Sequence, residues 1–335
     1  MRVAFFSTKN WVRTAFDRAN RDGRFEFTYL DASLEANTVS LVDGHDAVCV
    51  FVNDSVGPEV LHGLAERGVR CVALRCAGFN NVDLHKAKEL GVDVVRVPAY
   101  SPYAVAEHAL GMMLALNRRF HRAFNRVREG NFSLDGLLGF DVHGKTVGVI
   151  GTGKIGRVFC DLVRCFGCRI VAYDKYPNDD LARTGVEYVD LPTLYADSDI
   201  ISLHCPLTHE TYHMIDRQAI SAMRRGIMIL NTSRGALIDS NAVIDGLKEG
   251  TIGYLGLDVY EEEGDLFFEN LSDQVIHDDT FVRLQTFPNV LITAHQAFFT
   301  REAVNSIAEI TVGNLIEVDE GRELTNAVLP EKVTS

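Results

Sequence analysis

The chain has 335 residues, 47% of them hydrophobic, and a formal net charge of −13. This length exceeds the ~100–200 residues of one typical domain, so two domains are expected. An acidic chain repels phosphate backbones, which argues against a nucleic-acid partner. The longest apolar run, residues 109–116, is shorter than the ~18 residues of a membrane helix, and the N-terminus is predicted to open a strand rather than a signal peptide. We therefore expect no membrane partner and a cytoplasmic protein.

The seven cysteines are scattered through apolar segments and do not suggest a disulfide framework. Cys165 and Cys168 have C-x-x-C spacing, but no second pair completes a metal site. Buried thiols are the preferred interpretation, and a redox or metal pair is the alternative.

Short apolar runs typical of strands alternate with amphipathic segments in the first hundred residues. The predicted strands are 2–6, 25–30, 46–52, 70–74 and 92–97. Such alternation predicts an α/β fold with a parallel sheet. Two prolines in the segment 97–102 interrupt the alternation of strands and helices, so a domain boundary is expected near 100–102. A helix from about 103 to 122 should follow, and a last helix should be capped by Thr300, although the pattern does not say which domain that helix joins.

The segment 144–174 reads GKTVGVIGTGKIGRVFCDLVRCFGCRIVAYD. Gly151, Gly153 and Gly156 form G-x-G-x-x-G between a predicted strand and helix, and Asp174 ends the next strand. These glycines permit a tight turn, close approach of a pyrophosphate, and close helix–strand packing, while the helix N-terminus presents N–H groups to the phosphates. Asp174 can accept hydrogen bonds from ribose hydroxyls and would repel a 2′-phosphate. The pattern predicts NADH binding in preference to NADPH; a βαβ unit without a ligand is the alternative.

Later predicted strands also end in polar clusters, at 204–206, 231–235, 258–263 and 294–296. Ligands of open α/β sheets bind outside the carboxyl ends of the strands. Arg234, one glutamate and His295 are therefore expected to converge beside a nicotinamide. Reduction of a 2-oxo acid needs such a set: an acid for the carbonyl oxygen, a carboxylate to hold the imidazole, and an arginine for the substrate carboxylate. A surface ion pair for Arg234 and a structural role for His295 are the alternatives.

At this point the chain resembles the D-2-hydroxyacid dehydrogenase family, essentially from end to end. The resemblance is carried by RCAGFNNVD (75–83), RVPAYSPYAVAEHALGMMLALNR (96–118), GVIGTGKIG (148–156), SLHCPLT (202–208), NTSRGALID (231–239), LGLDVYEEE (255–263) and TAHQAF (293–298). The first two, with LFFEN (266–270), are typical of the lactate branch. The family implies two doubly wound parallel-sheet domains, Rossmann-like or flavodoxin-like, with a cleft between them. Residues 1–100 plus 299–335 would form the substrate domain, and 101–298 the NAD-binding domain.

The resemblance also implies residue roles. Arg234 would bind the substrate carboxylate, Glu263 would partner the histidine, and His295 would be the general acid/base. Further substrate contacts are implied at Ala77, Gly78 and Tyr100. Besides the three glycines, Asp174 and Arg234, the implied cofactor contacts are Lys154, Ile155, Cys205, Pro206, Thr211, Thr232, Ser233 and Asp258. Two departures stand out: Gly264 follows Glu263 where many relatives have proline, and Phe298 stands where some have tyrosine.

The implied activity is NADH-dependent reduction of pyruvate to D-lactate by a homodimer or homotetramer. Two alternatives remain open: a D-2-hydroxyacid dehydrogenase for a larger 2-oxo acid, glyoxylate or hydroxypyruvate, and an NAD-sensing protein like a transcriptional co-repressor. A competing motif, HETYH at 209–213, matches the H-E-x-x-H pattern of zinc peptidases. It follows Pro206 and precedes a helix expected to begin near Asp216, so we expect no bound metal.

Overall fold

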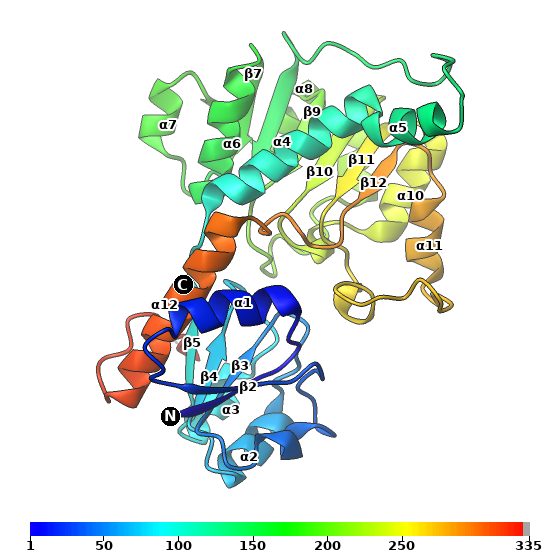
Figure 1. Cartoon of the computed structure of the whole chain (residues 1–335). Coiled ribbons are helices and arrows are strands. Elements are labelled where there is room, and N and C mark those ends of the chain that lie inside the picture. The colour runs from blue at the N-terminus through cyan, green and yellow to red at the C-terminus, as the bar shows by residue number, and fades with distance from the viewer. Residues whose placement is uncertain (331–335) are drawn as a thin grey trace. The chain divides into compact units, whose positions relative to one another are not determined.

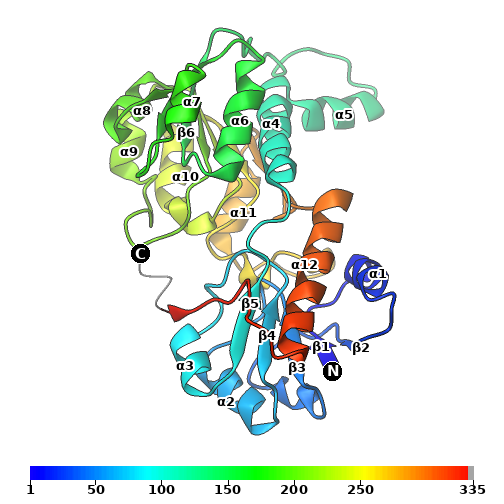
Figure 2. The ribbon, with the colours of Figure 1, turned by 90° about the vertical axis from the view of Figure 1, so that its left-hand side faces the viewer.

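The chain divides into two compact units (Figures 1 and 2). This structure is a computed structural model, and it describes residues 1–330. Unit 1 comprises Met1–Ser101 together with the chain from Phe299 onward, and unit 2 comprises Pro102–Phe298. Within the described residues, no helix has the length and apolar character needed to cross a membrane.

Unit 1 contains a five-stranded sheet in which every pairing is parallel. The order is β2-β1-β3-β4-β5, with β1 (Arg2–Phe5), β2 (Glu26–Tyr29), β3 (Ala47–Val50), β4 (Cys71–Leu74) and β5 (Asp93–Arg96). Its helices are α1 (Asn10–Ala19), η1 (Val39–Val42), α2 (Pro58–Glu66), α3 (Leu84–Glu89) and α12 (Arg301–Asp319). All five predicted strands are present, each slightly shorter than expected.

The last helix, α12, belongs to unit 1, a point that the sequence pattern left open. It packs against α1, β4 and β5, and Figure 1 shows it beside α1. The Thr300 side chain accepts a hydrogen bond from the Ala303 amide and caps the helix, as predicted.

Unit 2 contains a seven-stranded parallel sheet of order β12-β11-β10-β9-β6-β7-β8. Its strands are β6 (Thr146–Ile150), β7 (Arg169–Tyr173), β8 (Glu187–Tyr188), β9 (Ile200–Leu203), β10 (Ile227–Asn231), β11 (Ile252–Leu257) and β12 (Val290–Ile292). The first strand of unit 2 in chain order, β6, lies between β7 and β9, so the strand order reverses there. Such a reversal is where doubly wound folds bind ligands. The prediction of two parallel-sheet α/β domains is confirmed.

Helices cover this second sheet, and Figures 1 and 2 show α4 and α6 side by side. The helices are α4 (Pro102–Arg118), α5 (Phe120–Arg128), α6 (Lys154–Arg164), α7 (Asp179–Arg183), α8 (Leu191–Asp197), α9 (Arg217–Ala222), η2 (Gly235–Leu237), α10 (Ser240–Glu249), η3 (Glu263–Asp265) and α11 (Asp279–Gln285). Because both faces are covered, the central strands are almost continuously apolar.

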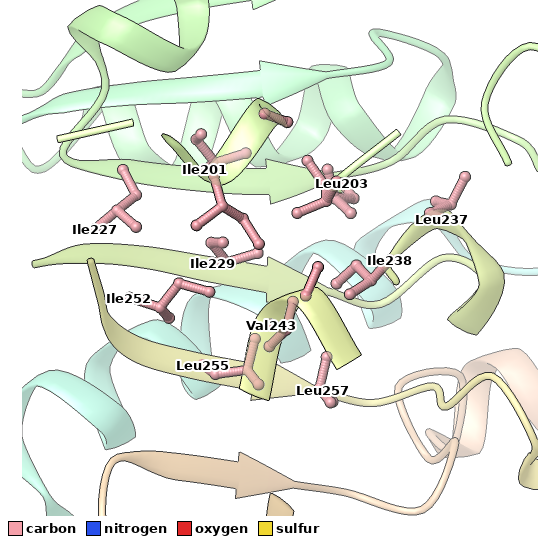
Figure 3. Packing of buried hydrophobic residues seen from close by; sticks show 14 of the residues in the cluster. Ile201, Leu203, Ile227, Ile229, Leu237, Ile238, Val243, Ile252, Leu255 and Leu257 are labelled. Atoms are coloured by element: carbon pink, nitrogen blue, oxygen red, sulfur yellow. The ribbon is translucent and has the colours of Figure 1, made fainter. Parts of the chain in front are cut away.

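The core beneath the later strands anchors the loops that follow them (Figure 3). Branched side chains of β9, β10 and β11 interdigitate there with residues of α10 and the preceding turn. The labelled members are Ile201, Leu203, Ile227, Ile229, Leu237, Ile238, Val243, Ile252, Leu255 and Leu257. Full burial of one such side chain stabilises the fold by about 1.5–3 kcal/mol. Packing of these strands therefore fixes the positions at which the following loops begin.

The structure corrects two expectations. The helix predicted from 103 to 122 ends at Arg118; Arg119 has a left-handed backbone with φ 51°, and α5 begins at Phe120. The buried Asn117 side chain exchanges two hydrogen bonds with the Phe140 backbone, at 2.7 and 2.8 Å, which fixes the end of α4 to a later loop. The cysteines are all free, but Cys165, the C-cap residue of α6, is exposed and Cys168 is half-buried, whereas buried thiols were expected.

Candidate active site

The glycine-rich turn between β6 and α6 is shaped by close backbone contacts. Gly151 has φ +91°, and a Cβ there would lie 2.6 Å from the Cys205 amide nitrogen. A Cβ at Gly156 would lie 2.0 Å from the Gly151 carbonyl oxygen. By contrast, a Cβ on Gly153 would meet nothing within 4 Å in the described chain. Two glycines therefore permit packing, while Gly153 and the first turn of α6, with Lys154 and Ile155, leave room for a pyrophosphate.

Asp174 stands at the end of β7, beside this turn. Its carboxylate accepts hydrogen bonds from the Thr152 amide at 2.6 Å, the Thr152 hydroxyl at 2.9 Å and the Tyr176 amide at 2.9 Å. The neighbouring Lys175 ammonium is paired with Glu210 at 3.0 Å, in an exposed position where such a pair is weak. A fixed carboxylate in this place suits ribose hydroxyls and opposes a 2′-phosphate.

His295 and Glu263 form the central pair of the site. The Nδ1 atom of His295 lies 2.7 Å from Glu263 Oε1, and the Tyr260 amide donates to the other glutamate oxygen at 2.9 Å. The two side chains are only 18% and 24% exposed. Because Glu263 holds Nδ1, the Nε2 atom is the one placed to exchange a proton with a substrate. Of the three consecutive glutamates, the one implied by the family resemblance, Glu263, is therefore the partner of His295.

A buried carboxylate, Asp258, supports the loop that carries His295. It is fully buried and accepts hydrogen bonds from the Thr293 hydroxyl at 2.7 Å and from the Gln296 and Ala297 amides at 2.9 and 3.0 Å. Burial alone would raise the pKa of Asp258, but hydrogen bonds from His108 and Thr293 hold this pKa below its ordinary value. The charged carboxylate thus organises residues 293–297, while its predicted contact with the cofactor stays a prediction.

Arg234 follows β10 and lies on a loop packed against the Glu263 loop. Its Nη1 atom donates to the Ser233 carbonyl at 2.7 Å. At Gly235 a Cβ would lie 2.1 Å from the Tyr260 carbonyl carbon and oxygen, so the two loops touch backbone to backbone. Arg234, Glu263 and His295 thus follow β10, β11 and β12, three strands that are neighbours in the sheet.

The other predicted cofactor residues lie on the loops after β9 and β10. Thr211 donates to the Pro206 carbonyl at 2.7 Å, and Ser233 donates to the Cys205 carbonyl at 2.6 Å. Burial raises the pKa of the Cys205 thiol to about 12, so it is a neutral group. The buried Thr232 hydroxyl has no hydrogen-bond partner within residues 1–330, and such an orphaned group is suited to a ligand. These residues fit a nicotinamide dinucleotide, although their individual contacts stay predictions.

The predicted substrate residues Ala77, Gly78 and Tyr100 belong to unit 1. The Ala77 carbonyl accepts a hydrogen bond from Arg96 at 2.8 Å, and the Gly78 carbonyl accepts one from Cys76 at 3.2 Å. These two hydrogen bonds connect the loop to Arg96 and Cys76, and its contacts with substrate stay predictions.

The HETYH segment forms turns rather than a helix, so its histidines do not share a helical face. His213 has a left-handed backbone with φ 50°, and its Nε2 atom is hydrogen-bonded to Glu261. Across residues 1–330, no group of three or more His, Cys, Asp or Glu side chains is arranged to hold a metal ion. The roles of His108, His213 and Glu261 were not predicted from the sequence; the triple glutamate was the only local signal, and it did not reveal their partners.

A glycine turn at the reversal of a parallel sheet, with an imidazole–carboxylate pair at neighbouring strand ends, is the construction of a nicotinamide-dependent dehydrogenase. Comparison with known proteins gives the family. Residues 110–297 match the family model described as D-isomer specific 2-hydroxyacid dehydrogenase, NAD binding domain, and the chain belongs to this family. Its cofactor is accordingly NAD, as predicted.

Similar proteins extend over the whole chain. A protein named D-lactate dehydrogenase from Escherichia coli (strain K12) is 54% identical over 329 residues, which cover 98% of this chain and 100% of that protein. The structure of Salmonella D-lactate dehydrogenase is 55% identical, with a TM-score of 0.87, and the match covers 98% of this chain and 100% of that one. The structure described as the pyruvate reductase of Chlamydomonas reinhardtii is 43% identical, with a TM-score of 0.92 and coverage of 97% and 98%.

Proposed function

We propose that this protein reduces pyruvate to D-lactate with NADH, in a reversible reaction. The observation that carries the proposal is the His295–Glu263 pair, with 2.7 Å between Nδ1 and Oε1, at the strand ends of a domain from this family. Similar proteins named D-lactate dehydrogenase and pyruvate reductase support pyruvate as the substrate. Arg234, Glu263 and His295 are proposed to carry the reaction.

Each of these residues has a distinct task. NADH, when bound, supplies the hydride that adds to the carbonyl carbon of pyruvate. Arg234 would grip the substrate carboxylate with charge-assisted hydrogen bonds. The protonated His295 would give its Nε2 proton to the carbonyl oxygen as negative charge develops there, and lactate oxidation would return that proton to the neutral ring. Glu263 would hold the ring by Nδ1 and stabilise its charged form.

We further propose that the protein works in the cytoplasm, as a homodimer or homotetramer. The seven free cysteines are typical of a reducing compartment. Apolar side chains gather on α5 and the loop after it, and their exposed fractions are large: Phe120 57%, Phe124 63%, Phe132 75%, Leu134 81% and Leu138 87%. Exposed apolar patches mark interaction surfaces, and a second copy of the chain is the proposed partner.

The test is NADH oxidation measured with a panel of 2-oxo acids, with the chirality of the product assigned. Pyruvate should give the highest kcat/KM, and the product should be D-lactate. His295→Ala should lower the rate by at least ~10²–10⁴-fold while NADH still binds. His209→Ala, which removes an exposed histidine, is the matched control and should resemble wild type.

Glu263→Gln separates the roles of the pair. Its kcat should fall less than that of His295→Ala, because Glu263 holds the ring by Nδ1 but does not exchange the substrate proton. A wild-type rate in His295→Ala would remove this residue from its role, and glyoxylate or a larger 2-oxo acid as the best substrate would redirect the proposal to another dehydrogenase of the family.

A further inference from the structure

A second histidine–glutamate pair lies next to the proposed catalytic one. Glu261 Oε1 is hydrogen-bonded to His213 Nε2, and Glu261 Oε2 accepts from the Ser240 hydroxyl at 2.8 Å and from the Ser240 amide at 3.4 Å. The His213 and Glu261 side chains are only 27% and 19% exposed. The three residues come from the segments that follow β9, β10 and β11. One carboxylate therefore joins the segments that follow three neighbouring strands.

The backbones of these loops are joined in the same place. The His213 amide donates to the Ala236 carbonyl at 2.9 Å, and the Ile215 amide donates to the Leu237 carbonyl at 3.0 Å. At Gly235, a Cβ would lie 2.4 Å from the Glu261 amide nitrogen. The β9 loop is thus held against the β10 loop, and the β10 loop against the β11 loop.

The His213 backbone shows that this arrangement is imposed by its surroundings. Its φ of 50° is left-handed, which costs free energy for a residue other than glycine. The ring stacks on Tyr212, with centroids 3.9 Å apart and planes inclined by 17°, and points its Nε2 atom at Glu261. Without His213, the partly buried Glu261 carboxylate would lose a charge-assisted partner inside a loop that already carries two more glutamates.

The spacing along the chain gives these contacts a functional meaning. Arg234 directly precedes Gly235, and Glu263 lies two residues after Glu261. We propose that His213, Glu261 and Ser240 form a loop clamp, which sets the position of Arg234 relative to Glu263 and so relative to His295. They are positioning residues: they do not touch the reacting atoms, and the proposal rests on the proposed function. Misplacement of reacting groups by about 1 Å can cost ~10²-fold in rate.

The clamp is tested with His213→Ala, Glu261→Gln and the double variant, assayed for kcat and KM with pyruvate. Each single variant should raise KM, because Arg234 shifts, and lower kcat, because Glu263 shifts; kcat/KM should fall by about 10–100-fold. The double variant should lose no more than either single one, since both break one contact. His213→Gln retains an N–H donor for Glu261 and should recover most of the loss. Glu262→Gln, on the same loop but exposed, is the matched control and should behave as wild type.

Amide hydrogen exchange gives a readout that does not depend on the reaction. In Glu261→Gln, segments 234–240 and 259–265 should exchange faster, while the strand β6 should not change. Faster exchange with an unchanged kcat/KM, additive effects in the double variant, or an equal loss in Glu262→Gln would each overturn the positioning role. If the wild type reduced no 2-oxo acid, the proposed function would be wrong. The clamp would then be tested by the exchange rates of segments 234–240 and 259–265 alone.

Discussion

The buried Asp258 offers a prediction whose size follows from its contacts. Asp258→Asn keeps the shape of the side chain but replaces one acceptor oxygen with an NH₂ group. In the less costly orientation, the NH₂ group takes the place of Oδ2 and faces the Ala297 amide, now 3.0 Å from Oδ2. Loss of a hydrogen bond to a charged group costs ~1.5–3 kcal/mol, and the unsatisfied amide adds ~1–3 kcal/mol. Together these contributions lower the expected free energy of unfolding by about 2.5–6 kcal/mol.

The expected shift of the melting temperature follows from the size of the unit. Unit 2 runs from Pro102 to Phe298, or 197 residues (298 − 102 + 1), and a unit of this size loses about 2–4 °C per kcal/mol. Asp258→Asn should therefore melt at least ~5 °C below wild type. The kcat for pyruvate should fall as well, because the loop that carries His295 loses its support.

The difference in stability between wild type and Asp258→Asn should also depend on pH. The pKa of Asp258 lies below its ordinary value of 3.8, so the stability that it contributes is present above that pH and is lost as pH falls through the lower folded pKa. Thermal unfolding of wild type and Asp258→Asn, followed by circular dichroism from pH 7 to pH 3, checks both points, with the exposed Asp273→Asn as control. Two outcomes would refute the reasoning: a decrease in melting temperature smaller than ~2 °C at pH 7, or a difference in melting temperature between wild type and Asp258→Asn that grows below pH 4.

Further predictions concern the cofactor turn and metal ions. Asp174→Ala should weaken NADH binding and narrow the gap between NADH and NADPH in kcat/KM, because a ribose acceptor and a repulsive charge are both removed; equal use of the two cofactors by wild type would contradict this role. Gly153→Ala should leave the melting temperature unchanged, because its Cβ meets open space, but it should lower the affinity for NADH in a fluorescence titration, because the Cβ occupies the path of the pyrophosphate. Gly156→Ala should lower both the melting temperature and the affinity for NADH, because its Cβ would lie 2.0 Å from a carbonyl oxygen. An unchanged melting temperature in Gly156→Ala would contradict that packing. Treatment with a chelator should leave activity intact, and a loss that added zinc restores would revive a metal role for HETYH.

The sequence predicted those parts of the site that local pattern encodes. The glycine turn, Asp174 and the parallel sheets each rest on periodicity and spacing within about thirty residues. The role of Glu263 came from a family resemblance, because three consecutive glutamates have equal local claims. The structure shows the physical basis of its pairing with His295: β11 and β12 are neighbours in the sheet, so the segments that follow them lie close together.

Other features depend on contacts that no local pattern records. The break between α4 and α5 coincides with hydrogen bonds between Asn117 and Phe140, 23 residues apart. His213 and Glu261 are 48 residues apart, and the motif around His213 pointed to zinc. In each case, a tertiary contact decides the local structure, whereas the local pattern suggested a continuous helix in the first case and a zinc motif in the second.

The discontinuity of unit 1 has a consequence for synthesis of the protein. The sheet of unit 1 is complete by Arg96, but the helix that packs on β4 and β5 begins only at Arg301. The intervening unit 2 is one continuous stretch of 197 residues, which a ribosome makes in about 10–40 s at ~5–20 residues per second. Through that interval the faces of β4 and β5 that α12 covers lack their partner. We therefore expect unit 2 to reach its folded state during translation before the N-terminal unit does, so that the order of folding reverses the order of synthesis.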